Sequence, residues 1–251
     1  MDWNLPVIGH REVGPVEEAR FDEVLASIED DVVFVHAGLG DLKQAFGGDV
    51  YALLLGKLRE HFGSVLAPGF TPSFRTSGIY HKQFSRPEVG AFSRQFLPDA
   101  EYRTDDPIHS ILVDGPYRFP DCDHADTFSE TGCWAKLADE NVTYLNVGTP
   151  WLICTHHHYV EHAIEVPYLE HREYDGVRYR DEQNHERITQ RNYEYAWPVK
   201  RSARKIERYL QSRGVLRKYD LEGLQVSIVG AGDLQSALEP KVRADPYYLV
   251  D

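Results

Sequence analysis

The sequence is 251 residues long, with 42% hydrophobic and 27% charged residues, which is typical of a globular protein with a substantial core. Its formal net charge of −13 argues against nucleic acid as a partner, because phosphates would be repelled. There is no apolar run near the roughly 20 residues that cross a bilayer, and no signal peptide is recognisable at the N-terminus. We therefore expect a cytoplasmic protein that binds neither membranes nor nucleic acid.

Strands and helices alternate along the chain, which is typical of an α/β fold. The predicted strands are short apolar runs that stop at glycine or proline, and the predicted helices have apolar residues three and four positions apart. In chain order, we predict a helix at the end of residues 1–30, a strand at 31–36, a loop at 37–40, a helix from 50 to 63, a strand at 64–68, a helix-like segment at 87–96, a strand at 108–113, a helix at 128–137, a strand at 142–147, a helix at 202–210, a strand at 224–229 and a helix at 233–238.

Residues 166–197 differ from the rest, because tyrosine and charged residues alternate there with little apolar content. Asp175-Gly176 is a hairpin-turn signal in the middle of this stretch. We interpret the stretch as a polar β-hairpin excursion within a single domain covering residues 1–251, and as a candidate contact in a homo-oligomer.

The three cysteines favour a reducing compartment. Cys122, Cys133 and Cys154 are odd in number and form no CxxC pair, so a disulfide framework is not expected. Cys154 precedes a run of histidines and could accept an acyl group, although a free cysteine is more often a small buried apolar residue.

That histidine run is the part of the sequence that points most directly to chemistry. Three consecutive histidines enter a helix-compatible segment that places His158, Glu161 and His162 on one face. The pattern HxxEH is that of inverted zinc peptidases, although no clear third ligand follows. Alternatively, Thr155 caps the helix and a neutral His158 takes a proton, with Glu161 as the orienting carboxylate. Both uses remain open, as does a surface cluster without a role.

Two glycine loops and one serine are further candidates. Gly38-Leu39-Gly40 and Gly47-Gly48 could hold a phosphate or pantetheine through backbone N–H groups, although neither spells a known phosphate-binding motif. Ser110 follows Arg103 by seven residues and could be a nucleophile if His158 is near, but it lacks a GxSxG elbow. A hydrogen-bonding hydroxyl is the simpler interpretation.

Taken in order, six segments resemble the aminoglycoside 3-N-acetyltransferase family, whose fold is unlike that of the GNAT enzymes. This chain differs from the family pattern in three places. Ala37-Gly38 replaces two serines, Asp106 replaces the histidine before the proline, and the stretch between Thr71 and Phe84 is short. The six segments are Val35–Leu39 with Gly47–Gly48, Leu66–Thr71, Phe84–Phe96, Arg103–Ser110, Ser129–Leu137 and Thr155–Glu161.

The resemblance implies a three-layer α/β/α domain with a central mixed sheet. It also implies direct transfer of an acetyl or short acyl group from acetyl-CoA, without a metal, to a small amine-bearing acceptor in a ternary complex. An aminoglycoside or an amino sugar would be the acceptor, and a non-catalytic protein on the same scaffold is an alternative. By the same resemblance, His158 is the general base beside Glu161, Ser110 and Thr155 surround the thioester, and His36, Gly38, Leu39, Gly47, Gly48, Arg103 and Ser110 face coenzyme A.

Overall fold

The computed structural model describes residues 12–251, which contain a central sheet of seven strands and a second sheet of three. In the central sheet the order is β4-β5-β2-β1-β6-β10-β9. β1 runs parallel to β2 and β6, whereas β5 and β10 are antiparallel to their neighbours, so the sheet is mixed. The strands are β1 (Val32–Ala37), β2 (Ser64–Pro68), β4 (Tyr102–Arg103), β5 (Ile111–Asp114), β6 (Thr143–Val147), β9 (Arg217–Leu221) and β10 (Leu224–Gly230).

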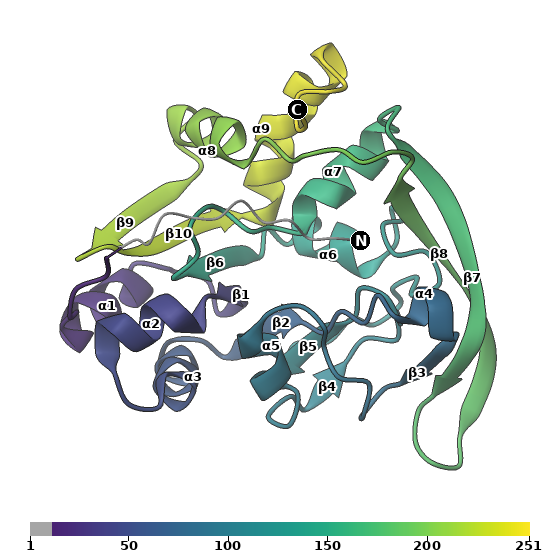
Figure 1. Cartoon of the computed structure of the whole chain (residues 1–251), viewed down its shortest axis with the longest axis horizontal. Coiled ribbons are helices and arrows are strands. Elements are labelled where there is room, and N and C mark those ends of the chain that lie inside the picture. Colours follow the sequence, from purple (N-terminus) through teal and green to yellow (C-terminus); the bar gives the residue numbers. More distant parts are fainter. Residues whose placement is uncertain (1–11) are drawn as a thin grey trace.

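Helices cover both faces of this sheet because its inner strands are apolar on both sides. In β1, Val33 and Val35 point into one core, and Phe34 points into the other. Figure 1 shows the two helical layers with the sheet between them, which confirms the predicted three-layer arrangement. One layer has α1 (Glu18–Ala26), α2 (Leu39–Phe46), α3 (Val50–His61) and α5 (Ala91–Phe96), and the other α6 (Cys133–Asp139), α7 (His156–Ile164), α8 (Ala203–Ser212) and α9 (Ala231–Ala244).

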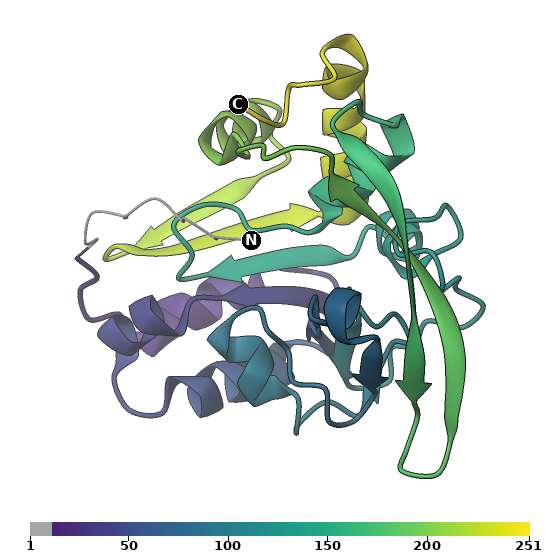
Figure 2. The same cartoon turned by 45° about the vertical axis from the view of Figure 1, so that its right-hand side comes forward.

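The predicted hairpin is present as β7 (Leu169–Tyr179) and β8 (His185–Tyr195), but its predicted turn is wrong. Asp175 and Gly176 lie inside β7, and the chain turns at residues 180–184 instead. Asp181 makes that turn by accepting hydrogen bonds from the backbone N–H groups of the two residues before the next strand. Figure 2 shows this end of the hairpin extending beyond the rest of the structure.

Gly176 is a glycine for a different reason. β3 (Ile79–His81) pairs in parallel with β7, and the short α4 (Phe74–Ser77) packs against the same place. A Cβ at Gly176 would lie 2.4 Å from the Gly78 carbonyl oxygen and 2.6 Å from the Phe74 ring. The glycine therefore permits a close approach of backbones rather than a turn.

Several other boundaries depart from the prediction. The residues predicted as a loop at 37–40 already include the first turn of α2, with Gly38 at the N-cap position. α5 begins at Ala91 instead of Pro87, and α6 begins at Cys133 instead of Phe128. The short strands β3 and β4 and the charged edge strand β9 were not predicted, since they have no apolar alternation long enough to recognise. Among residues 12–251, no helix is both long and apolar enough to cross a membrane.

Gly38→Ala is expected to lower the free energy of unfolding by about 2 kcal/mol, because a Cβ there would lie 2.1 Å from the Gly148 carbonyl oxygen. Gly40→Ala is the matched control, since nothing lies within 4 Å of its Cβ position and alanine favours a helix by about 0.5–1 kcal/mol. Urea unfolding of the two variants measures both effects. Equal effects of the two substitutions would contradict this account of Gly38.

Candidate active site

His158 and Glu161 lie one turn apart on α7, and their side chains are hydrogen-bonded. The distance between His158 Nδ1 and Glu161 Oε2 is 2.9 Å. The two groups differ in exposure, because the His158 side chain is 35% exposed whereas that of Glu161 is 0% exposed. One imidazole nitrogen is thus held by a buried carboxylate while the ring remains within reach of a ligand.

Thr155 stands at the N-cap position of α7, but its side chain makes no capping hydrogen bond. The predicted role of Thr155 as a side-chain cap is therefore wrong. Its backbone carbonyl oxygen accepts a hydrogen bond of 2.9 Å from the His158 N–H group instead. The helix keeps its position through burial of Tyr159 and Val160 in the core.

Two further side chains bind the Glu161 carboxylate. Tyr168 donates to Oε1 at 2.9 Å, and Arg201 donates to Oε2 at 2.9 Å. Burial disfavours the charged carboxylate, but the Arg201 guanidinium and His158 outweigh it and lower the pKa of Glu161 to about 2. Glu161 is therefore ionised at physiological pH.

Arg201 was not predicted as a site residue, although it completes the group around Glu161. Its Nη2 atom also donates to the Tyr195 hydroxyl at 2.5 Å and lies 3.4 Å from His158 Nδ1. An antiparallel bridge to Val250 and a hydrogen bond from the Ser202 N–H group to the Leu249 oxygen hold this segment. No local motif marks Arg201, because these contacts depend on the path of the hairpin and of the C-terminal segment.

On another side, aromatic rings surround His158. Its ring centroid lies 6.1 Å from that of Phe128, which in turn is 5.3 Å from the His109 ring. Nearby, Asp106 accepts hydrogen bonds from the His109 N–H group and the Thr127 hydroxyl. Burial raises the pKa of Asp106 to about 6. A buried acid thus stands at the position where the resembled family has a histidine.

The HxxEH segment is not assembled as a metal site in the part of the chain that is described. The His162 ring packs edge-on against Tyr193, with centroids 4.1 Å apart, whereas His158 is hydrogen-bonded to Glu161. Within residues 12–251, no group of three histidine, cysteine, aspartate or glutamate side chains is placed to hold a metal ion. The acid–base interpretation of His158 is the one that the observed contacts favour.

Ser110 and Arg103 are hydrogen-bonded to each other, close to the ends of β2 and β5. Ser110 is fully buried, and its Oγ donates to the Gly69 oxygen at 2.7 Å and accepts from Arg103 Nε at 2.9 Å. Arg103 also donates to the backbone oxygens of Lys82 and Ser85, at 3.2 and 2.6 Å. The two side chains thus tie β4 to the loop that follows β2.

His36 and Gly38 mark the end of β1. Burial lowers the pKa of His36 to about 3, so its ring is neutral, and its Nε2 atom is buried without a hydrogen-bond partner. Leu39 begins α2, which separates it from Gly47 and Gly48 at the other end of the helix, about 12 Å along its axis. The two glycine loops, predicted to face one ligand, are therefore at opposite ends of α2.

Cys154 lies just before α7, but it is buried, and burial raises the pKa of its thiol to about 12. A thiol in that state is a poor nucleophile near neutral pH. The alternative role of Cys154 as an acyl acceptor is therefore not supported by its surroundings.

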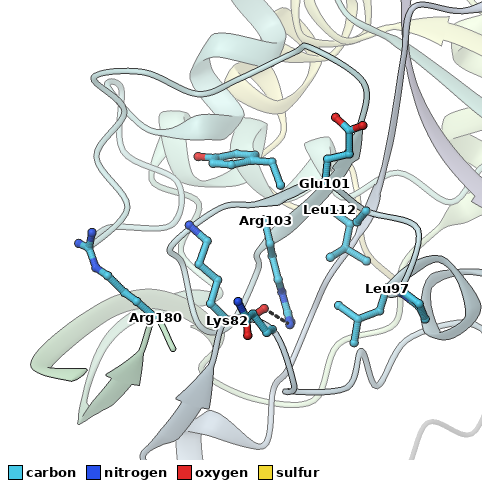
Figure 3. A pocket seen from close by; sticks show the side chains of 10 residues that line it. Lys82, Leu97, Glu101, Arg103, Leu112 and Arg180 are labelled. Atoms are coloured by element: carbon cyan, nitrogen blue, oxygen red, sulfur yellow. Dashed lines mark hydrogen bonds between the residues drawn. The ribbon is translucent and has the colours of Figure 1, made fainter. Parts of the chain in front are cut away.

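An open hollow of about 490 Å³ lies at the edge strand β4 (Figure 3), and its lining contains neither His158 nor the residues that contact it. Lys82, Arg103 and Arg180 contribute positive charge to its wall. Each of them is already paired: Lys82 and Arg180 with Asp105, and Arg103 with backbone oxygens. The hollow is therefore a poor candidate for strong phosphate binding.

Comparisons with known proteins place the chain near one group of enzymes. The family described as Aminoglycoside 3-N-acetyltransferase matches residues 54–240. Aminoglycoside acetyltransferase AAC(3)-Xa is 16% identical, with a TM-score of 0.73 and 94% of each chain covered. AAC-IIIb with CoASH is 17% identical, with a TM-score of 0.71, 89% of this chain and 96% of that chain covered. A mutant of AAC(3)-IVa in complex with apramycin is 16% identical, with a TM-score of 0.68 and 96% of each chain covered. Among curated proteins, no sequence matches.

Proposed function

Because the chain belongs to the aminoglycoside 3-N-acetyltransferase family, we propose that it transfers an acetyl group from acetyl-CoA to an amine of an aminoglycoside or a related amino sugar. The hydrogen bond between His158 and the buried, ionised Glu161 carries this proposal. The similar enzymes bound to CoASH and to apramycin support the donor and acceptor classes. A net charge of −13 would favour the approach of a cationic acceptor.

His158 acts as the general base in this proposal. Since Glu161 accepts a hydrogen bond from Nδ1, the other ring nitrogen, Nε2, carries the lone pair that takes the proton. The acceptor nitrogen attacks the thioester carbonyl carbon, a C–N bond forms, and the C–S bond breaks as the coenzyme thiolate leaves. The proton removed from nitrogen is held on Nε2 and is then available to the leaving sulfur. The Glu161 carboxylate stabilises the imidazolium formed in between.

The remaining predicted residues fit two different roles. Leu39 begins α2, and the helix N-terminus with its dipole suits a phosphate of the coenzyme. Thr155, whose side chain does not cap α7, is a polar group beside the thioester in this proposal, as the resemblance implies. Ser110 and Arg103, by contrast, have a structural role, because both donate hydrogen bonds to the Gly69 carbonyl oxygen just after β2.

Incubation of the protein with acetyl-CoA and a panel of aminoglycosides and amino sugars should release free coenzyme A thiol and add one acetyl group to the acceptor. Thiol release is measured with a chromogenic disulfide, and the product by mass spectrometry. Acceptors whose amines are already acetylated are the matched control and should give no release. A protein that binds no coenzyme A by calorimetry and releases no thiol would support the non-catalytic alternative, and activity lost in chelator would support the zinc alternative.

A further inference from the structure

Cys122 and Cys133 lie together at the two ends of one loop, outside the group around His158. The backbone closes the loop, because Asp123 and Gly132 form a parallel bridge. The side chains of Cys122 and Cys133 interact with each other. His124 Nδ1 lies 3.2 Å from Cys133 Sγ, so the pair of thiols has an imidazole beside it. The bridge thus closes a ten-residue loop between two thiols that interact with each other.

The two thiols are not equivalent. Cys122 is partly exposed, whereas Cys133 is buried. The hydrogen bond from Cys133 lowers the pKa of the Cys122 thiol, against the opposing effect of burial, and the charge of Lys136 adds to the lowering. The same contact, together with burial, raises the pKa of Cys133. Cys122 is thus the thiol that a reagent in solution can reach and that forms a thiolate more readily.

We propose that Cys122 and Cys133 form a dithiol–disulfide couple that reacts with low-molecular-weight disulfides, with His124 as the base for the second step. The Cys122 thiolate attacks one sulfur of the small disulfide, a new S–S bond forms, and one small thiolate leaves. The Cys133 thiol passes its proton to His124 and attacks the Cys122 sulfur, which releases the second small thiolate. The protein loses two electrons, and the small disulfide is reduced to two thiols.

His124 suits this role because its Nδ1 atom lies 3.2 Å from the Cys133 sulfur, and burial lowers the pKa of its ring, which is therefore neutral. The loop also leads to the active-site candidate. It carries Phe128, whose ring centroid is 6.1 Å from that of His158, and Thr127, whose hydroxyl donates to Asp106 at 2.7 Å. A disulfide between the ends of the loop would fix the segment that packs against the His158 ring.

Treatment of the whole protein with oxidised glutathione, followed by mass spectrometry without reduction, tests the proposal. The expected product has lost two hydrogen atoms, carries no glutathione and keeps one free thiol, that of Cys154. Cleavage at aspartate separates Cys122 from Cys133, so their fragments should stay joined until a reductant is added. The matched control Cys154→Ser should form the same bond as the unaltered protein.

Variants of the pair separate the two steps. Cys133→Ser should keep glutathione on Cys122, because the resolving thiol is gone, and Cys122→Ser should remain unmodified. His124→Asn should accumulate the mixed disulfide before the internal bond forms. The proposal is overturned if the unaltered protein retains glutathione, if Cys154→Ser blocks the internal bond, or if the purified protein holds zinc that shields both thiols. If the internal disulfide forms at the same rate in His124→Asn as in the unaltered protein, His124 is not the base of the second step.

Discussion

Replacement of His158 by alanine is expected to lower kcat for thiol release by about 10²–10⁴-fold, the usual contribution of a positioned general base. Stability should change little, because the side chain is 35% exposed and Glu161 keeps its hydrogen bonds to Arg201 and Tyr168. Initial rates at saturating acetyl-CoA and a thermal unfolding curve measure the two quantities. A folded variant with nearly no turnover is the expected result.

His162→Ala is the matched control for this experiment, since His162 lies one turn further along α7 and packs against Tyr193. Its kcat should stay near that of the unaltered protein. A zinc enzyme would need both histidines, so it would lose activity in both variants. Full activity in His158→Ala, or equal losses in the two variants, would reject His158 as the base.

The parts of the fold that the sequence predicts best are the buried strands. β1, β2 and β6 are buried along nearly their whole length because both of their faces are covered, and their mostly apolar sequences can be recognised without knowing their neighbours. β4 has two residues and β9 is mostly charged, so each becomes a strand only through pairing with a longer neighbour. Such pairing depends on the tertiary structure, so it cannot be predicted from the local sequence pattern.

The same distinction applies to the site. His158 and Glu161 are three residues apart, so helical spacing alone places them in contact, and the structure confirms that contact. Arg201 is 40 residues from Glu161 along the chain, and Tyr195 reaches it only because the hairpin has one particular register. The turn predicted at Asp175-Gly176 is wrong for the same reason. Gly176 allows close packing against α4, a tertiary contact that cannot be recognised from the sequence.

Replacement of Arg201 by methionine is expected to reduce the free energy of unfolding by about 3–5 kcal/mol near neutral pH, the usual effect of breaking a buried ion pair. Glu161 is 0% exposed, and its contact with Arg201 Nη2 at 2.9 Å is the main compensation for its buried charge. Methionine retains much of the apolar stem, so the loss would come from the unpaired carboxylate. Urea unfolding measures it.

The size of this effect should depend on pH in a defined direction. In the native protein the pKa of Glu161 is lowered from 4.5 to about 2, so its stabilisation is complete above pH 4.5 and is lost as the pH falls from 4.5 to 2. Without Arg201, burial dominates and the pKa rises. The difference in stability between the two proteins should therefore be large near pH 7 and shrink towards pH 3. A difference that stays constant with pH would indicate lost packing instead.

A double-mutant cycle separates charge from packing. Glu161→Gln alone should also destabilise the protein, because it leaves the Arg201 guanidinium without its carboxylate partner. Removing both charges in Arg201→Met with Glu161→Gln leaves neither group uncompensated, so the double variant should be more stable than Arg201→Met by about 1–3 kcal/mol near pH 7. The double variant should nevertheless have low acetyltransferase activity, because His158 has lost the carboxylate that accepts its Nδ1 hydrogen bond. A double variant no more stable than Arg201→Met would show that the buried pair does not set the stability of this region.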